Sequence, residues 1–393
     1  MTTFSFSFSG EDIEEDSAIP EISQHPKHAA ETGTLHRQAR STAFPVAGQP
    51  GLQPQRHELT AMLQALPSKV SYGNLMVTLD DGSLVDIPRR ELWDVRVQLM
   101  AEGDDEGLGN LGKDDVKTGV YEGGFKSWES SVDLVKVLGV RRERVLGTGA
   151  VGRRLLEVRG LFFPCFDDGL GSWEWSLVEL VLILNGADDM QLGCGTALPS
   201  LAAFQWQLQQ DVASTKAAFH LSLADYNPSV LQLVTLPNIL LSWAQFKARE
   251  SWELEGELEI NPELIEAFIS DMVHHNITLS FFSGAWSPEF VDNIKKQIIS
   301  EPASLTVIGA ETIYSPMALK SFAETLMAIL AAQSDHDRTA FVAAKKVYFG
   351  VGGSIEDFCD LAREMDAVVE QVREESDGVR RTVVEVGIAS NVP

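Results

Sequence analysis

From residue 219 to the end of the chain, short apolar runs of strand length alternate with longer amphipathic runs of helix length. Strands are expected at 219–224, 277–282, 305–309, 339–348 and 382–388, and helices at 228–241, 289–299, 318–332 and 355–369. Pro237 is expected to kink the first helix or end it early, because proline lacks the N–H that a helix interior uses. Strands that alternate with helices form a mainly parallel sheet covered on both faces. The expected fold class is therefore α/β.

The chain before this region divides into two parts by composition. Residues 1–55 are poor in aliphatic side chains and rich in Ser, Thr, Pro, His, Gln and Gly, which predicts a disordered tail. Residues 56–115 form an N-terminal extension, with a helix at 57–66, a hairpin at 70–85 that turns at Asp80-Asp81-Gly82, an amphipathic element at 89–99 and an acidic loop at 101–115. Residues 116–393 are expected to form the main domain.

The charge of the chain restricts its partners. Lys and Arg number 31 against 57 Asp and Glu, so the net charge is −26. Direct binding to nucleic acid or to an anionic membrane needs clustered Lys and Arg, so we expect neither. A basic partner is favoured, although acidity also serves solubility. The 3 cysteines are too few and too scattered for a disulfide framework or a zinc site, which favours a reducing, intracellular compartment. No secretory signal or membrane helix is visible, so we expect a soluble protein.

A glycine-rich turn is the most informative local pattern. Gly193-Cys194-Gly195 precedes a helix, and Asp225 follows the next strand, about one βα unit later. A lone G-x-G is often just a tight turn. In a doubly wound sheet, however, an acid in this place accepts both hydroxyls of a ribose. NAD enzymes share this arrangement, but Leu198 stands where their third glycine would be. S-adenosylmethionine is the alternative ligand, with an adenosine ribose and no pyrophosphate.

Several ordered segments resemble one known family. They are Val120-Tyr121-Glu122-Gly123-Gly124-Phe125-Lys126-Ser127-Trp128-Glu129-Ser130, Asp225-Tyr226-Asn227, Phe282-Ser283-Gly284-Ala285-Trp286, Glu311-Thr312-Ile313-Tyr314, Lys345-Lys346-Val347-Tyr348-Phe349-Gly350-Val351-Gly352-Gly353 and, in the extension, Pro88-Arg89-Arg90-Glu91-Leu92. Together they resemble the histidine protein methyltransferases, enzymes of eukaryotes that use S-adenosylmethionine. The resemblance covers most of residues 57–390.

This resemblance implies a fold, a cofactor and a substrate. The fold would be a Rossmann-like, seven-strand class I methyltransferase sheet with helices on both faces. The substrate would be one histidine of a large-subunit ribosomal protein, and the enzyme would act in the cytoplasm and nucleus. The residues expected at the cofactor are Gly193 and Gly195 at its methionine and ribose end, Asp225 at the ribose, Trp286 near the adenine, Trp128 and Glu129 along the pocket, and Glu157 at the end of the first strand. Without the resemblance, Trp128 and Trp286 would be interpreted as core aromatics.

The expected chemistry needs little acid–base help. A neutral imidazole is a competent nucleophile near neutral pH, since its pKa is about 6.5. A carboxylate that accepts the other ring N–H would fix the tautomer and stabilise the imidazolium that forms. We assign this role to Glu311, after the fourth strand, and expect Tyr314 to flank the target ring. Glu311 is also a candidate cap for the next helix. Two alternative functions remain: a lysine methyltransferase, and a non-catalytic ribosome-assembly protein with a degenerate cofactor fold.

One segment conflicts with this fold. A buried strand should lead into the glycine turn, yet residues 185–191 are Asn-Gly-Ala-Asp-Asp-Met-Gln, a poor strand. A good strand ends earlier, at Glu157, and joining Glu157 to Leu192 gives Leu-Leu-Glu-Leu-Gly-Cys-Gly. The 34 residues at 158–191 begin with Val, whose codons start GT, and end with Gln, which CAG encodes. We hypothesise a retained intron or a gene-model error. The rival is a genuine insertion with a helix at 173–184, in which case Glu157 should be detached from Gly193.

Overall fold

The computed structural model describes residues 52–102, 127, 129–146, 152–159, 194–211, 218–298, 303–313, 316–332, 337–348 and 353–388. The chain divides into two units, residues 1–40 and 41–393, and all the described residues belong to the second. The anomalous segment lies outside the described residues from position 160 onward, as do Trp128, Gly193 and Tyr314. No helix in the described part is long and apolar enough to cross a membrane.

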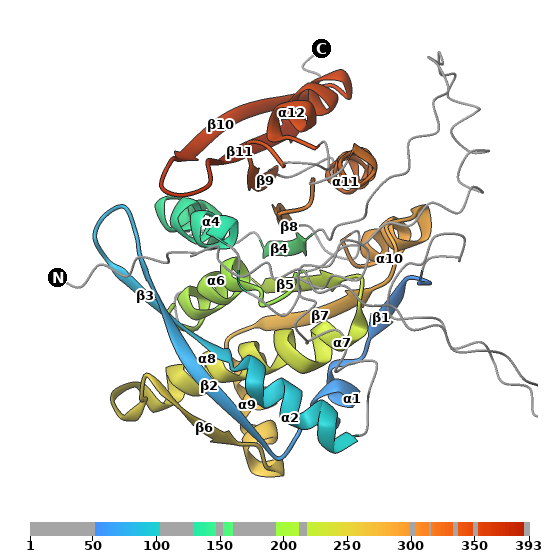
Figure 1. The fold of residues 1–393 in the computed structure, drawn as a ribbon. Helices are drawn as coiled ribbons and strands as arrows, with labels where there is room; N and C mark the ends of the chain where they lie inside the picture. Colours follow the sequence, from blue (N-terminus) through green and yellow to red (C-terminus); the bar gives the residue numbers. More distant parts are fainter. Residues whose placement is uncertain are drawn as a thin grey trace, which may run out of the picture. The chain divides into compact units, whose positions relative to one another are not determined.

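The main sheet has eight strands in the order β1-β7-β5-β4-β8-β9-β11-β10 (Figure 1). Its strands are β1 (Gln55–His57), β4 (Gly152–Arg159), β5 (Phe219–Asp225), β7 (Ile277–Ser283), β8 (Ala303–Ala310), β9 (Arg338–Lys345), β10 (Ala367–Glu375) and β11 (Arg381–Ile388). The five from β7 to β9 run parallel, whereas β11 is antiparallel to both its neighbours and β1 is antiparallel to β7. The expected α/β class is confirmed.

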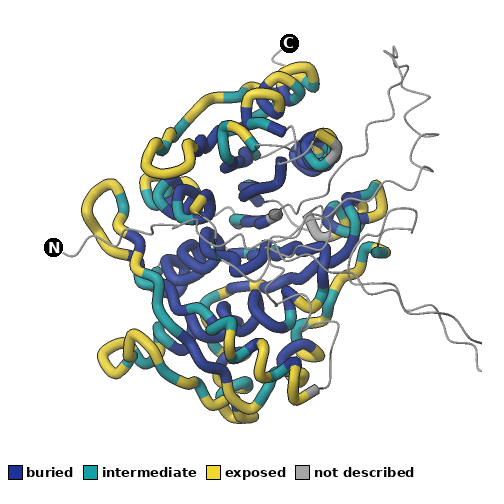
Figure 2. Tube along the Cα trace, viewed as in Figure 1, coloured by how far each residue is buried: buried dark blue, intermediate teal, exposed yellow. Residues whose placement is uncertain are grey.

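Alternate residues of each parallel strand enter opposite hydrophobic layers. Leu155 of β4 belongs to one buried cluster and Leu156 to the other, and Phe281 and Phe282 of β7 divide in the same way. This follows from the period of two in a strand. Helices cover both layers, as Figure 1 shows, and Figure 2 shows the buried residues concentrated in the sheet and its facing helices. One layer takes α4 (Glu129–Val140), α5 (Arg142–Leu146), α6 (Leu198–Leu208), α8 (Leu236–Ala248) and α9 (Pro262–His274), and the other takes α10 (Pro288–Ile298), α11 (Pro316–Ala331) and α12 (Ile355–Glu364).

A second, antiparallel sheet joins two strands of the N-terminal extension to one strand of the main domain. Its strand order is β3-β2-β6, with β2 (Lys69–Thr78), β3 (Leu84–Arg90) and β6 (Glu255–Glu259). The expected hairpin is confirmed, and Gly82 in its turn has φ of +82°. The short helices α1 (Leu59–Gln64) and α2 (Leu92–Glu102) flank this sheet in sequence. The strand β6 was not anticipated, because it is mostly acidic and pairs only with β2.

Two expectations about helix limits are wrong. The helix from Pro228 does not end at Pro237: α7 (Pro228–Val230), a π-helical turn (Leu231–Thr235) and α8 follow one another without a break. Pro237 has no N–H for the carbonyl four residues before it, Leu233 O, and this oxygen accepts from Arg90 Nη1 instead (2.9 Å). The helix expected at 355–369 stops at Glu364, because Asp366 has φ of +64° and β10 begins at Ala367.

Candidate active site

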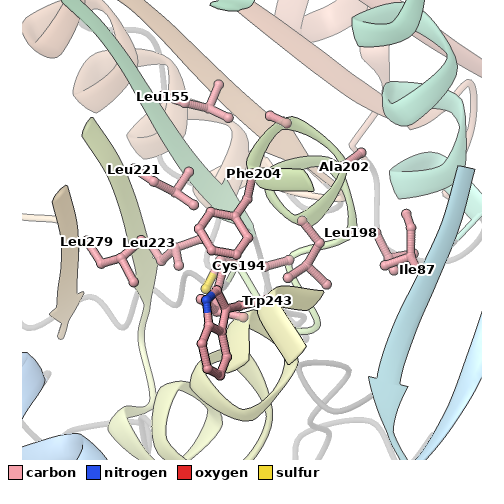
Figure 3. Packing of buried hydrophobic residues seen from close by; sticks show 14 of the residues in the cluster. Ile87, Leu155, Cys194, Leu198, Ala202, Phe204, Leu221, Leu223, Trp243 and Leu279 are labelled. Carbon is pink, nitrogen blue, oxygen red and sulfur yellow. The ribbon is translucent and has the colours of Figure 1, made fainter. Parts of the chain in front are cut away.

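The glycine turn connects the carboxyl edge of the sheet to α6. Cys194 N donates to Ala224 O of β5 (2.6 Å), and Ala197 N donates back to Cys194 O (2.9 Å). Gly195 and Ala197 have φ of +56° and +57°, so the backbone bends twice in the left-handed region. Figure 3 shows Cys194 and Leu198 packed with Leu223, Phe204 and Trp243 beneath this turn. The core therefore fixes where the turn's amides lie.

Asp225 is bound to the glycine turn directly. Its Oδ2 accepts from Gly195 N (3.0 Å) and its Oδ1 accepts from Asn227 N (3.0 Å). The residue is 1% exposed and ends β5. Each carboxylate oxygen has two lone pairs, so backbone contacts orient the group and leave it able to accept from a ligand's hydroxyls. Gly195 and Asp225 are thus brought together as the sequence predicted.

Other contacts also hold the turn. Thr235 Oγ1 donates to Gly195 O (2.7 Å), and Asn238 Nδ2 donates to Thr196 O (3.1 Å). Both donors are fully buried, on the π-helical turn and on α8. A π-helical turn often marks a functional site. Here it places a hydroxyl that satisfies a buried carbonyl of the loop.

Glu157 lies against the helix that follows the turn. Its Oε2 accepts from Ser200 N (3.0 Å) in the first turn of α6, and the residue is fully buried. Unpaired N–H groups at a helix start favour such a carboxylate. The expectation that the insertion detaches Glu157 from Gly193 stays a prediction, because Gly193 lies outside the described residues. The contact that Glu157 makes is a helix-capping one, and its role at a cofactor stays a prediction.

Trp286 stands just after β7 and has one buried atom without a partner. The residue is 6% exposed, and the centroid of its ring lies 5.0 Å from the centroid of the Phe322 ring of α11. Its Nε1, like Thr312 Oγ1 after β8, has no hydrogen-bond partner among the described residues. A buried, unsatisfied N–H is costly. The ring is a core aromatic, as the simpler interpretation held, but its polar edge remains available to an acceptor such as a purine nitrogen.

Glu311 forms a three-residue cluster that sequence patterns only partly revealed. Ser130 of α4 donates to Glu311 Oε1, and Tyr348 donates to Glu311 Oε2 (2.6 Å). Glu311 is 7% exposed and has φ of +54°, and its N donates to Ala343 O (2.9 Å). In the part of the chain that the structure describes, its carboxylate bonds to these hydroxyls and caps no helix. Tyr348, expected in the core of a strand, lies beyond β9 instead.

Glu129 lies in a different contact. It begins α4, is largely exposed, and its Oε2 accepts from Arg381 Nη1 (2.8 Å). Arg381 Nε also donates to the buried Asp133 Oδ2 (2.7 Å). Glu129 therefore contacts β11 rather than the glycine turn. The placements of Gly193, Trp128 and Tyr314 fall outside the described residues.

The arrangement of strands and turn defines a class of protein. Without the added edge strand β1, the sheet has seven strands with the last antiparallel, a glycine turn beside the central β4 and an acid after β5. This is the sheet of the S-adenosylmethionine-dependent methyltransferases, and it binds ligands beyond the carboxyl ends of its strands. The cofactor fits the residues present, because Asp225 is oriented for hydroxyls and Trp286 Nε1 is a buried donor without a partner.

Comparison with known proteins identifies the family. The chain is 30% identical over 382 residues to histidine protein methyltransferase 1 of Saccharomyces cerevisiae, covering 91% of this chain and 89% of that one. It is 32% identical over 316 residues to the protein of that name in Schizosaccharomyces pombe, covering 79% and 77%. A homolog from Bos taurus is 25% identical over 69% of this chain and 57% of its own. The chain belongs to the histidine protein methyltransferase family, as its motifs suggested.

Two further comparisons contribute nothing to this assignment. No family model matches the chain. The crystal structure of the N-terminal domain of EvdMO1, in the presence of SAH and D-fucose, is 11% identical, with a TM-score of 0.28 over 68% of this chain and 86% of that one. At that score the likeness carries no argument. The fold class therefore rests on strand order, and the family rests on sequence.

Proposed function

We propose that this protein transfers a methyl group from S-adenosylmethionine to an imidazole nitrogen of one histidine in a basic ribosomal protein. The observation that carries the proposal is the bond from Gly195 N to Asp225 Oδ2, which joins the glycine turn to the end of β5. Family membership supplies the class of acceptor. The ribosomal substrate, and action in the cytoplasm and nucleus, are parts of the proposal that rest on the resemblance and on the net charge of −26.

The chain's own residues would hold the cofactor in sequence along the sheet edge. Trp286 would donate to the adenine, Asp225 would accept from the ribose hydroxyls, and the turn at Gly195 would lie under the methionine part. When bound, the cofactor supplies a methyl group that is activated by its positive sulfur. The protein contributes positioning and the exclusion of water, which together account for much of the rate in such displacements.

Glu311 would orient the acceptor ring. A histidine that attacks through one nitrogen carries a proton on the other, and a buried carboxylate would accept that N–H and stabilise the imidazolium. Ser130 and Tyr348 donate to the two oxygens of Glu311 and so fix the plane of its carboxylate. Tyr314 beside the target ring stays a prediction. No strong base is required, because neutral imidazole is already nucleophilic near pH 7.

A transfer assay tests the proposal: the protein is incubated with radiolabelled S-adenosylmethionine and purified large-subunit ribosomal proteins, and mass spectrometry then identifies the labelled residue. We expect label on one histidine, which Glu311→Gln nearly abolishes. Glu324→Gln, an exposed change on α11, is the matched control and should keep full transfer. Label on lysine would replace the proposal with lysine methylation. No label on any protein would favour a non-catalytic binding role.

A further inference from the structure

We propose that Arg89 binds the carboxylate of the cofactor's methionine part. The inference rests on the proposed function and assigns a role to the Pro88-Arg89-Arg90 segment of the N-terminal extension. Arg89 lies on β3, two residues after Ile87. Residues two apart in a strand face the same side. Ile87 points toward α6 and lies near Leu198 (Figure 3), so Arg89 faces the start of the same helix.

A short chain of hydrogen bonds connects Arg89 to the glycine turn. Its Nη1 donates to Ser127 Oγ (2.8 Å), and Ser127 Oγ donates to Thr196 Oγ1 (3.1 Å). Thr196 directly follows Gly195, whose N–H bonds Asp225. The neighbouring Arg90 reaches the same residue from the backbone: Arg90 N donates to Asn238 Oδ1 (2.7 Å), and Asn238 Nδ2 donates to Thr196 O (3.1 Å). The end of β3 therefore connects to the turn through Thr196, the residue after the one that bonds Asp225.

The charge of Arg89 is not neutralised by a direct partner. Its Nε is buried without a hydrogen-bond partner, and among the described residues its guanidinium forms no ion pair. Burial lowers the pKa of Arg89, while the charge of Glu91 opposes that shift. Arg90 differs, because its Nε donates to Asp94 Oδ2 (2.6 Å), its Nη1 to Leu233 O (2.9 Å) and its Nη2 to Gln98 Oε1 (2.8 Å). Arg90 is structural, whereas Arg89 keeps donors for an anion.

The cofactor offers one group of matching chemistry at this end. With adenine at Trp286 and the ribose at Asp225, the amino-acid part of the cofactor would be held near Gly195 and Thr196, to which the hydrogen bonds of Arg89 and Ser127 lead. Its carboxylate is the only anion of the molecule. Arginine presents planar, paired donors that suit a carboxylate, and such charge-assisted bonds are the strong ones. A half-buried guanidinium without a counter-ion is unfavourable, so an anionic ligand would relieve the cost of holding Arg89 there.

Calorimetry on the full chain with two ligands tests this assignment. S-adenosylhomocysteine carries the carboxylate, and decarboxylated S-adenosylhomocysteine is the same molecule without that group. We expect Arg89→Met to weaken the binding of S-adenosylhomocysteine by roughly 10- to 100-fold, the range for the loss of a hydrogen bond to a charged group. Its affinity for the decarboxylated ligand should match that of the unaltered protein. The affinity of Arg89→Lys for S-adenosylhomocysteine should lie between those of the unaltered protein and Arg89→Met. Arg363→Met, an exposed change on α12, should change neither affinity.

Three results separate the alternatives. Equal weakening of both ligands by Arg89→Met would show that Arg89 only braces the turn, and would overturn the assignment. The unaltered protein gives an independent check, because it should prefer S-adenosylhomocysteine to the decarboxylated ligand. Absence of binding to either ligand would instead refute the proposed function.

Discussion

At the scale of single residues, Glu311 combines a strained backbone with a side chain held in one orientation. A non-glycine residue in the left-handed region costs of order 1–3 kcal/mol, and such residues concentrate at functional sites. Glu311 has φ of +54°, while Ser130 and Tyr348 each donate to one of its carboxylate oxygens. The hydroxyls hold the carboxylate at the edge of β8 in one orientation, which is what an acceptor for an imidazole N–H needs.

Substitution of Glu311 and Tyr348 should therefore affect turnover more than cofactor binding. We expect Glu311→Gln to lower kcat by roughly 100-fold and Tyr348→Phe by roughly 10-fold, because an amide cannot stabilise an imidazolium as a carboxylate does. The affinity for S-adenosylhomocysteine should stay within about twofold in both, because among the described residues the Glu311 carboxylate bonds to Ser130 and Tyr348 and not to the glycine turn. Steady-state kinetics and calorimetry measure the two effects. A matched loss of affinity would place Glu311 at the cofactor instead.

The residues predicted from sequence were those with a local signal. Gly195 and Asp225 come from a turn motif and a strand end one βα unit apart, so the alternation of strands and helices alone brings them together. Ser130 and Tyr348 lie 181 and 37 positions from Glu311, and nothing in their own neighbourhoods indicates that contact. Tyr348 could have been found from the Glu311 segment only by asking which residue follows the adjacent strand β9.

At the scale of elements, β1 extends the sheet beside β7 and the segment that leads to Trp286. His57 Nε2 lies 2.7 Å from Ser283 Oγ, and Ala285 N donates to Leu52 O (2.9 Å). Gly284 has φ of +110°, and a Cβ there would stand 2.7 Å from Gln53 O. Only glycine allows this approach, so the segment that follows β7 is shaped to receive β1.

Docking of β1 should weaken in mild acid. Burial lowers the pKa of His57 below its usual 6.5. The unfolded chain therefore binds a proton first as the pH falls, so stability is full above about pH 6.5 and declines toward the lowered pKa. His57→Gln, which keeps hydrogen-bonding capacity without titrating there, should remove this part of the decline. Thermal unfolding of both proteins between pH 5 and pH 8 measures it, and parallel curves would contradict the assignment.

Element types were predictable, and their limits were less so. The strands β5, β7, β8 and β11 and the helices α10 and α11 agree with their apolar runs within a few residues. The end of α12 was missed because Ala367-Val368-Val369 continues a helical pattern, and only the left-handed Asp366 and the pairing with β11 make it a strand. Tertiary pairing overrides local propensity here.

At the scale of the whole molecule, the sheet is complete without residues 160–191. The central strand β4 pairs with β5 and β8 through Val158, and α6 begins at Leu198. Deletion of 158–191 places Leu192 after Glu157, where it can continue the strand. We expect that variant to bind S-adenosylhomocysteine with unchanged affinity and to unfold at the same temperature or higher. Loss of folding on deletion would show that the segment is an integral part of the fold, and would contradict the retained-intron hypothesis. A mature transcript that always carries codons 158–191 would contradict it as well.

The net charge of −26 should make the affinity for a basic protein substrate depend on the salt concentration. Attraction between an acidic enzyme and a basic protein is screened by salt, with a Debye length of about 8 Å at physiological ionic strength. The KM for the ribosomal protein should therefore rise several-fold between 50 and 300 mM salt, while binding of S-adenosylhomocysteine changes little. Kinetics at four salt concentrations test this. A flat KM would mean that the charge serves solubility alone.

Strand order was the feature of the whole chain that sequence conveyed best. Alternating strands and helices, with one glycine turn, predicted the α/β class, and the motifs pointed to the family that full-length identity then established. The second sheet and the added strand β1 were less visible, since each consists of short or acidic segments that gain stability only from partners far away in sequence.

Calorimetric titration of the full chain with S-adenosylhomocysteine tests most directly whether the glycine turn and Asp225 form the cofactor site. We expect one site per chain, with affinity lowered at least roughly 10-fold by Asp225→Asn, because an amide nitrogen cannot accept from Gly195 N and a ribose hydroxyl together. Asp292→Asn, an exposed change on α10, should leave the affinity unchanged. If the unaltered protein gives no heat of binding, or if Asp225→Asn binds as tightly, the turn is not the cofactor site.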